Sequence, residues 1–202
     1  MAKAPGVGAG KQRLAGEIGK TEAWRINRRL NARTLRAALD PRWRTLLCVT
    51  PDAATMAALP GVWPSRTPRI GQGCGDLGER LARALRPHRA VAVIGTDCPL
   101  ISRTHIASAF AALKHAPFAV GPTDDGGFWI LAAHSGRAAA RAMHDVRWST
   151  KHAAADVVRN LNAPVTRLAT LYDVDEARDL ARWRQGEPAR PKLAIARASS
   201  GS

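Results

Sequence analysis

Short apolar runs alternate along this chain with longer segments in which apolar residues recur every three or four positions. Five runs have the length and the unbroken apolar character of buried strands: 45–50 (TLLCVT), 90–95 (AVAVIG), 118–121 (FAVG), 128–133 (FWILAA) and 165–169. Continuous apolar character is typical of strands that are covered on both faces, as in a mainly parallel sheet. The pattern therefore predicts such a sheet.

The segments between these runs begin with residues that can cap a helix. The cap accepts a hydrogen bond from a free backbone N–H of the first turn, and an acid three positions later completes a capping box. Four helices are predicted in this way: from Asp76 with Glu79 to about Leu85, from Ser102 to Leu113, from Ser149 to about Leu161, and from Asp175 through Trp183. Strands that alternate with helices predict an α/β three-layer domain with a mostly parallel central sheet.

The length of 202 residues suits one domain with a short appendage. We expect residues 1–185 to form the domain. Residues 186–202 are polar, contain Pro, Ser and Gly, and are predicted to be a loose tail. No apolar run approaches the ~18 residues that a membrane span needs.

The charge of the chain and its cysteines indicate which class of ligand and which cellular compartment to expect. The net charge of +15 comes mostly from arginines, densest over 25–44, that are not gathered into one tract with interleaved aromatics. This pattern favours phosphorylated small ligands over nucleic acid. Cys48, Cys74 and Cys98 lie far apart and form no Cys-x-x-Cys motif, which predicts a reduced, cytoplasmic protein.

The first candidate for chemistry is a glycine-rich segment at the start of the chain, Lys3-Ala4-Pro5-Gly6-Val7-Gly8-Ala9-Gly10-Lys11-Gln12-Arg13. Glycines let the backbone approach a ligand closely, while lysine and arginine supply charge and a planar fork for phosphate oxygens. The segment therefore predicts a polyphosphate-binding loop. Such loops follow a buried strand, but only Met1 and Ala2 precede this one. We therefore expect the first strand to be missing and an apolar stretch of about five to eight residues, the usual length of a strand, to be encoded upstream.

Three acidic segments follow predicted strands. Asp97 comes directly after one strand, where ligands of open α/β sheets bind, and a carboxylate there can hold a hard divalent cation. Asp125 stands in Asp124-Asp125-Gly126-Gly127, and Asp173 and Asp175 alternate so that either could complete a metal site with Asp97. Each also suits a simpler role: Asp97 and Asp125 as turn residues, Asp175 as a helix cap.

Two further segments carry weaker signals. Gln72 and Gly75-Asp76 lie in a glycine-rich stretch that ends at Arg80, where Gln72 could hydrogen-bond a base edge. Trp148-Ser149-Thr150 precedes a predicted helix, and such a tripeptide is also typical of packing plus a cap.

In this order the motifs resemble one family closely. It is the glycosyltransferase-A-like family called radical-SAM/selenodomain-associated transferase 1, or arsenosugar-biosynthesis glycosyltransferase-like, which is related to 2-phospholactate guanylyltransferase. The resemblance is carried by Lys3-Ala4-Pro5, Gly8, Lys11-x-Arg13-Leu14, Gln72 to Arg80, Gly95-Thr96-Asp97-Cys98-Pro99, Gly121-Pro122, Asp125-Gly126-Gly127, Trp148-Ser149-Thr150 and Asp173-Val174-Asp175. The chain departs from the family pattern at Gln12, Arg147 and Phe128-Trp129, none of which removes a charge needed for phosphate or metal.

The resemblance implies a nucleotide-diphospho-sugar transferase fold and a set of roles. Lys3, Gly6, Gly8, Gly10, Lys11 and Arg13 would hold nucleotide phosphates, and Gln72, Gly75, Asp76 and Arg80 would border the base or ribose. Asp97 would bind Mg²⁺ or Mn²⁺, with Asp173 or Asp175 closing the metal site. Asp125, Gly126, Gly127, Trp148, Ser149 and Thr150 would line the acceptor side, and Asp97, Lys11 and Asp125 would be catalytic.

Three functions stay open at this point. The first is glycosyl transfer from a nucleotide-sugar to a small-molecule acceptor. The second is nucleotidyl transfer from an NTP to a phosphorylated acceptor with release of pyrophosphate, which the cationic loop favours. The third is a non-catalytic nucleotide- or RNA-binding module. The nucleobase, the acceptor and the oligomeric state are not encoded in any motif that we recognise.

Overall fold

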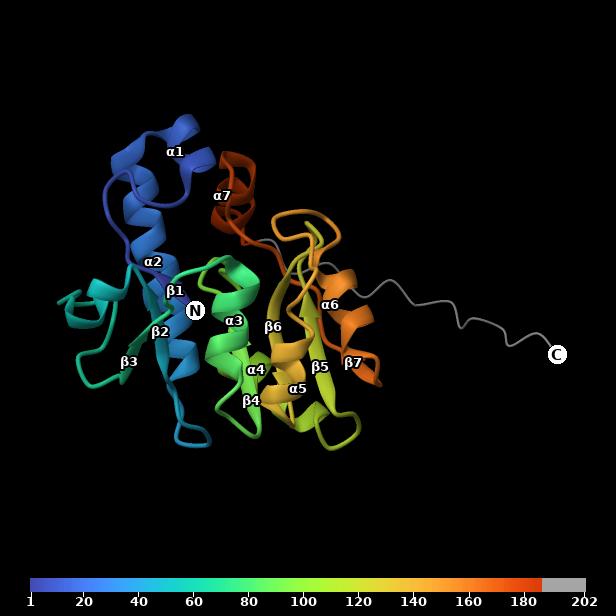
Figure 1. Ribbon diagram of the computed structural model, residues 1–202. Helices are drawn as coiled ribbons and strands as arrows, with labels where there is room; N and C mark the ends of the chain where they lie inside the picture. Colours follow the sequence, from blue (N-terminus) through green and yellow to red (C-terminus); the bar gives the residue numbers. More distant parts are fainter. Residues whose placement is uncertain (187–202) are drawn as a thin grey trace.

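The computed structural model describes residues 1–186 (Figure 1). The predicted tail lies, apart from Gly186, outside these residues. The strands are β1 (Ala2–Lys3), β2 (Leu47–Thr50), β3 (Arg69–Gly71), β4 (Val91–Ile94), β5 (Phe118–Pro122), β6 (Phe128–Ala133) and β7 (Val165–Arg167). The helices are α1 (Gln12–Ile18), α2 (Lys20–Ala38), the 3₁₀ helix η1 (Asp52–Met56), α3 (Leu77–Leu85), α4 (Arg103–Ala112), α5 (Gly136–Arg141), α6 (Ala153–Leu161) and α7 (Ala177–Arg184).

The strands form two ladders, β1-β2-β3 and β4-β6-β5-β7. β2 pairs in parallel with β1 and β3, and β5 pairs in parallel with β7. β6 alone runs antiparallel, to both β4 and β5. The α-ammonium of Met1 donates to the carbonyl of Ile94 at 2.8 Å, which joins β1 to β4. The predicted α/β fold with a mostly parallel sheet is therefore confirmed, with β6 as the exception.

The expectation of a missing first strand needs correction. Ala2 and Lys3 form β1, with Ala2 in register with Val49 and Lys3 with Thr50. Ala2 is buried, and the N–H of Ala4 continues the ladder by donating to the carbonyl of Thr50 at 2.8 Å. β1 is held in place by its parallel pairing with β2 and by the hydrogen bond from the Met1 α-ammonium to the carbonyl of Ile94. The glycine-rich loop thus does follow a strand.

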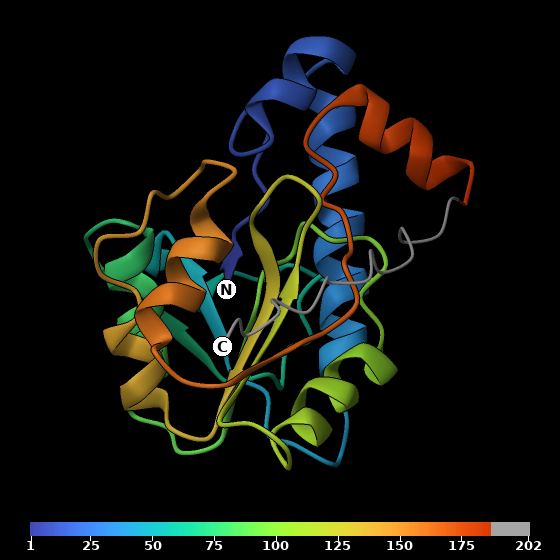
Figure 2. The ribbon, with the colours of Figure 1, turned by 90° about the vertical axis from the view of Figure 1, so that its right-hand side faces the viewer.

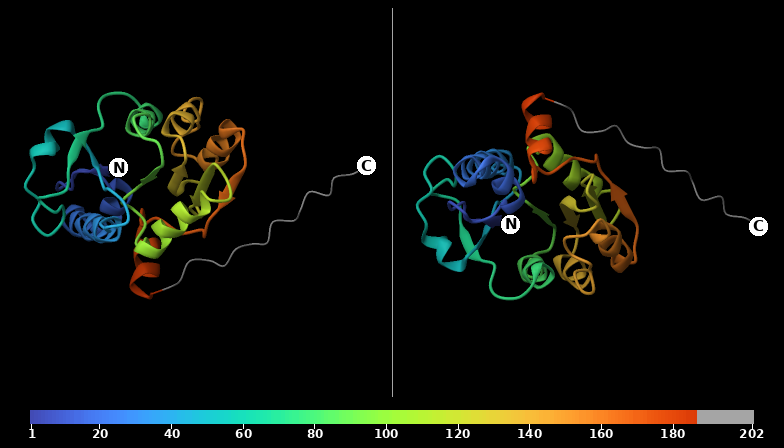
Figure 3. Two further views of the ribbon diagram at one scale, coloured as in Figure 1. Left: turned by 90° about the horizontal axis from the view of Figure 1, so that it is seen from below. Right: turned by 90° about the horizontal axis from the view of Figure 1, so that it is seen from above.

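Helices cover both faces of the larger ladder, as Figures 2 and 3 show. α3, α5 and α6 pack on one face and α4 with the end of α2 on the other. Side chains of β6 point alternately into the two cores: Leu131 and Ala133 face the first, and Ile130 and Ala132 face the second. This alternation of strand side chains explains why 128–133 is apolar throughout and confirms a sheet covered on both faces.

Two of the four predicted helix starts are confirmed. Asp76 accepts from the N–H of Glu79 at 2.8 Å while Glu79 accepts from the N–H of Asp76 at 2.9 Å, a complete capping box for α3. Ser102 accepts from the N–H of His105 at 3.2 Å and caps α4.

The other two starts are wrong. α6 begins at Ala153 after His152, because Ser149 has a left-handed backbone (φ 60°) and stands outside the helix. The N-cap of α7 is Glu176, in a capping box with Asp179. Asp175 cannot serve as this cap because its carboxylate accepts from Lys11 instead. Among the described residues, no helix is long and apolar enough to span a membrane.

Candidate functional site

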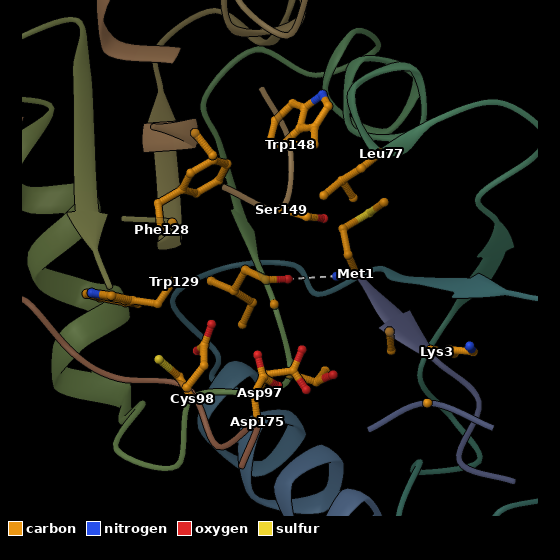
Figure 4. Close-up of a pocket in the computed structure, with 18 of the residues that line it drawn as sticks. Met1, Lys3, Leu77, Asp97, Cys98, Phe128, Trp129, Trp148, Ser149 and Asp175 are labelled. Atoms are coloured by element: carbon orange, nitrogen blue, oxygen red, sulfur yellow. Dashed lines mark hydrogen bonds between the residues drawn. The ribbon is translucent and has the colours of Figure 1, made fainter. Parts of the chain in front are cut away.

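A cleft of about 770 Å³ opens where β1 and β4 meet (Figure 4). β4, β5 and β7 run in one direction, so the loops after them, which carry Asp97, Asp125 and Asp173, share one edge of the sheet. The predicted site residues that line the cleft are Lys3, Gly10, Lys11, Arg13, Gln72, Arg80, Asp97, Asp125, Gly127, Trp148, Ser149, Thr150, Asp173 and Asp175. Those that do not line it are Gly6, Gly8, Gly75, Asp76 and Gly126.

The glycine-rich loop turns sharply before α1. Gly8 and Gly10 have φ of 73° and 83°, a region that glycine enters without strain. Lys11 adopts the same left-handed region (φ 50°, ψ 44°) as the residue preceding α1. A non-glycine residue rarely takes this conformation, and where it does the surrounding structure imposes it. The result is that the side chain of Lys11 reaches into the cleft.

Lys11 bridges two of the predicted metal ligands. Its Nζ lies 2.5 Å from Oδ1 of Asp97 and 2.8 Å from Oδ1 of Asp175. Only 5% of the Lys11 side chain is exposed, against 46% and 47% for the two aspartates. Burial alone would lower the pKa of Lys11, but the charges and hydrogen bonds of Asp97 and Asp175 outweigh it and raise that pKa above its ordinary value. The lysine predicted to hold phosphate is therefore paired with carboxylates in this structure.

Asp173 lies deeper than its two acidic neighbours. Burial of its carboxyl, with the charge of Asp97 nearby, raises the pKa of Asp173 to about 7. The loops are tied together by the N–H of Val174, which donates to the carbonyl of Asp97 at 3.1 Å, and by the thiol of Cys98, which donates to the carbonyl of Tyr172 at 3.1 Å. Segments 97–98 and 172–175 consequently form one acidic corner of the cleft.

This corner offers part of a cation site. Within residues 1–186, no group of three or more His, Cys, Asp or Glu side chains is placed to hold a metal ion. Oδ1 of Asp97 and Oδ1 of Asp175 nevertheless converge on a single cation, the Lys11 ammonium. Carboxylate oxygens are what Mg²⁺ and Mn²⁺ prefer. The donor pair therefore fits a hard divalent ion, with Lys11 standing where that ion would bind.

Basic side chains line the cleft beside this corner. Lys3 and Arg13 come from the glycine-rich loop and its flanks, and Arg80 comes from α3. The Nε of Arg80 is buried and has no hydrogen-bond partner among the described residues. A buried donor without a partner costs about 1–3 kcal/mol, which an anionic ligand oxygen would relieve.

Gln72 and Asp76 have structural roles here. Gln72 is buried, and its side-chain N–H₂ donates to the carbonyls of Ala2 (3.2 Å) and Cys48 (3.0 Å), which ties β1 to β2. Its amide donors are thus already used, which leaves them unavailable for the base contact that the sequence suggested. Asp76 caps α3 and lies outside the cleft.

The opposite wall is built from the loops after β5 and α5. Oδ1 of Asp125 accepts from Oγ1 of Thr123 (2.5 Å) and the N–H of Gly127 (3.0 Å), so this carboxylate also closes its own turn. Gly126 has φ 91° and packs against the backbone of Lys151, where a Cβ would clash. Glycine is thus required at 126 for the two loops to meet.

An ion pair outside the cleft fixes the Trp148-Ser149-Thr150 loop. The guanidinium of Arg147 donates to both carboxylate oxygens of Asp156 at 2.8 Å, and the N–H of Arg147 donates to Oδ2 at 3.1 Å. Asp156 is fully buried, and Arg159 adds a contact at 3.0 Å. The hydrogen bonds from Arg147 hold the pKa of Asp156 well below its usual range. Arg147 therefore serves as an anchor for this loop.

Some lining residues were missed from the sequence: Asn27, Phe128, Trp129 and Lys151. Lys151 follows Trp148-Ser149-Thr150 directly and could have been included with that motif. Asn27 gives a subtler signal, a polar residue on the buried face of α2, where its Oδ1 accepts from Asn31 at 2.9 Å.

Solved structures with the same fold are known. A protein of Desulfovibrio desulfuricans G20, described as a candidate nucleotide-diphospho-sugar transferase, matches 92% of this chain and 85% of its own with a TM-score of 0.81 and 24% identity. A homologue of Rv0371c from Mycobacterium sp. strain JC1 matches 92% of this chain and 93% of its own, with a TM-score of 0.56 and 16% identity. These likenesses show that the chain shares the α/β fold of both proteins, including that of the candidate nucleotide-diphospho-sugar transferase.

Sequence comparison gives the family. No curated protein matches the chain. A family model described as an uncharacterised protein conserved in bacteria, DUF2064, matches residues 34–150. That segment includes Asp97, Asp125 and the Trp148-Ser149-Thr150 loop but begins after the glycine-rich loop. The chain belongs to this DUF2064 family of bacterial proteins.

Proposed function

We propose that the protein is a metal-dependent, glycosyltransferase-like enzyme that uses a nucleotide-sugar donor and a small-molecule acceptor. The observation that carries the proposal is that one cleft joins basic side chains, Lys3, Arg13 and Arg80, to a convergent carboxylate pair, Asp97 and Asp175. A nucleotide diphosphate is the ligand that needs both, since its oxygens bind arginine and lysine directly and bind carboxylates through a shared cation.

The roles follow from position. Lys3, Lys11 and Arg13 take the phosphates, and Arg80, with its unpartnered Nε, takes a phosphate or ribose oxygen. Asp97 and Asp175 hold Mg²⁺ or Mn²⁺, which when bound offsets negative charge on the leaving diphosphate. The acceptor lies toward Asp125, Gly127 and the Trp148-Ser149-Thr150 loop, which the Arg147–Asp156 pair holds in place. The subfamily suggested by the sequence, radical-SAM/selenodomain-associated transferase 1, fits these roles.

Nucleotidyl transfer is the second candidate, and the number of cations in the cleft favours it. Lys3, Arg13 and Arg80 carry three positive charges in addition to Lys11, which Asp97 and Asp175 neutralise, and a set of cations of this size suits a triphosphate. In this reaction an oxygen of a phosphorylated acceptor attacks the α-phosphate and pyrophosphate leaves with the electron pair of the broken bond. The same carboxylate pair and metal would serve both reactions.

A thermal-shift screen separates the candidates. Melting curves are recorded with UDP- and GDP-sugars plus Mn²⁺, with the four NTPs plus Mg²⁺, with single-stranded RNA, and with each metal alone as the control. A nucleotide-sugar that raises the melting temperature only with metal supports glycosyl transfer, while an NTP that does so supports nucleotidyl transfer. RNA as the one stabilising ligand would contradict the enzyme proposal in favour of a binding module.

A further inference from the structure

We propose that Lys11 is a displaceable internal counter-ion: its ammonium holds the carboxylate pair until a divalent cation replaces it, and it then turns to the phosphates. This inference rests on the proposed function, because it assumes that Asp97 and Asp175 bind a metal. It adds that metal and phosphate bind as a coupled pair, with Lys11 as the coupling group.

The first argument is the electrostatics of the acidic corner. Asp97 and Asp175 are about half exposed, yet both place an oxygen within 2.8 Å of one buried ammonium. Like charges this close repel, so the corner needs a cation at all times. In the absence of a metal, Lys11 supplies it.

The second argument is that the cleft offers the Lys11 ammonium a second position, beside the proposed phosphate site. It shares the cleft with Lys3 and Arg13, for which no ion pair is found within residues 1–186. A lysine is a point charge on a flexible four-carbon stem, so its ammonium can move several ångströms while the backbone stays fixed. The left-handed backbone at Lys11 anchors the stem at the tip of the loop. The ammonium can therefore exchange carboxylate for phosphate by rotation of its side chain alone.

The consequence is thermodynamic coupling. A metal that binds alone must displace Lys11, and its apparent affinity falls by the fraction of time for which the carboxylates are free. A diphosphate that binds alone faces a lysine already neutralised by two aspartates. When both bind, the metal releases the Lys11 ammonium for the phosphates, and the phosphates draw that ammonium away from the carboxylates that the metal needs. The metal and the diphosphate must therefore raise each other's affinity by the same factor.

The test compares the wild-type chain with Lys11→Met, Lys11→Arg and Lys114→Met. Lys114 is exposed at the end of α4, so its replacement removes the same charge far from the cleft. Mn²⁺ binding is measured by equilibrium dialysis at pH 7.5, with and without inorganic pyrophosphate, and circular dichroism checks folding. We expect Lys11→Met to bind Mn²⁺ alone at least about tenfold more tightly than wild type, if the carboxylates are free for a tenth of the time or less. Lys11→Arg and Lys114→Met should not tighten binding.

The other possible outcomes would contradict the counter-ion role of Lys11, the metal assignment, or both. Equal Mn²⁺ affinity in wild type and folded Lys11→Met would overturn the counter-ion role while leaving metal binding, and so the proposed function, intact. If no variant binds Mn²⁺ even with pyrophosphate, both the metal assignment and this inference are wrong. If Lys11→Met does not fold, the wild type still decides: pyrophosphate that fails to tighten Mn²⁺ binding excludes the coupling.

Discussion

At the scale of single residues, Asp97 should matter for turnover and little for folding. Its side chain is about half exposed and pairs with Lys11, which keeps Asp175 as a partner if Asp97 is replaced. We therefore expect Asp97→Asn to fold with a melting temperature within about 2 °C of wild type. Its metal-dependent turnover should fall about 10²-fold or more, the typical cost of losing one preorganised electrostatic group. Near-normal turnover at saturating metal would show that Asp97 is not a metal ligand.

At the scale of elements, the Arg147–Asp156 pair anchors the loop between α5 and α6. Because its pKa is lowered in the folded state, Asp156 stabilises the protein at pH values above its unfolded pKa of ~3.9. That stabilisation is lost as the pH falls through the folded pKa. Asp156→Asn should therefore lower the melting temperature most at pH 7, and the difference from wild type should shrink below about pH 5.

Melting curves at half-unit steps from pH 3 to 8 measure this difference. Asp145→Asn is the matched control, since 94% of that side chain is exposed and its partner is a histidine at 3.2 Å. The control should follow wild type throughout. A pH-independent deficit in Asp156→Asn would mean that Asp156 acts through shape and neutral hydrogen bonds rather than through its charge.

Gln72 offers a second prediction at this scale, because the sequence and the structure assign it different roles. If its amide ties β1 to β2, then Gln72→Leu, which keeps the volume but removes two donors, deletes the hydrogen bonds to the carbonyls of Ala2 and Cys48. Each hydrogen bond lost in this way contributes about 0.5–1.5 kcal/mol to stability. A loss of 1 kcal/mol lowers the melting temperature of a domain this size by roughly 2–4 °C.

Nucleotide specificity separates the two roles of Gln72. A strand tie predicts a lower melting temperature with the order of preference among UDP, GDP, CDP and ADP unchanged. A base-reading side chain predicts an unchanged melting temperature with that order altered. The four dissociation constants, measured by calorimetry for wild type and Gln72→Leu, decide between them.

The elements that the sequence predicted correctly are those with strong local signals. Buried strands such as 128–133 are apolar throughout, and α3 has its capping box. α2 was missed because its buried face carries Asn27, Asn31 and Thr34, which interrupt the apolar stripe, and its outer face is crowded with arginines. β3 was missed because it has three residues and its Ile70 is exposed.

The candidate site also has features that the local sequence predicts and features that depend on the tertiary fold. That Asp97, Asp125 and Asp173 lie near one another was predictable, because each follows a strand and parallel strands end at one edge of the sheet. The bridge from Lys11 to Asp97 and Asp175 was not predictable, since it joins residues 86 and 164 positions apart whose meeting depends on the tertiary fold. Local patterns thus identified the groups, and the fold determined their partners.

At the scale of the whole molecule, the chain carries a net charge of +15, and its cleft is lined by Lys3, Lys11, Arg13 and Arg80. A positive field of this extent attracts anionic ligands from a distance and speeds their encounter. Salt shortens the reach of the field from about 30 Å at 0.01 M to about 3 Å at 1 M. Contacts inside the cleft are screened less. Salt should consequently slow association more than it speeds dissociation.

We expect the association rate of a fluorescently labelled nucleoside diphosphate to fall at least several-fold between about 0.02 and 0.5 M NaCl. The dissociation rate should change by less than a factor of about two, because direct contacts with the basic groups dominate it. Stopped-flow fluorescence at constant Mn²⁺ measures both rates, and the matching nucleoside without phosphates is the control, since it carries no charge to steer. Salt sensitivity confined to the dissociation rate would mean that the charge acts only through direct contacts in the cleft. The arginines elsewhere on the surface would then have no effect on the association rate.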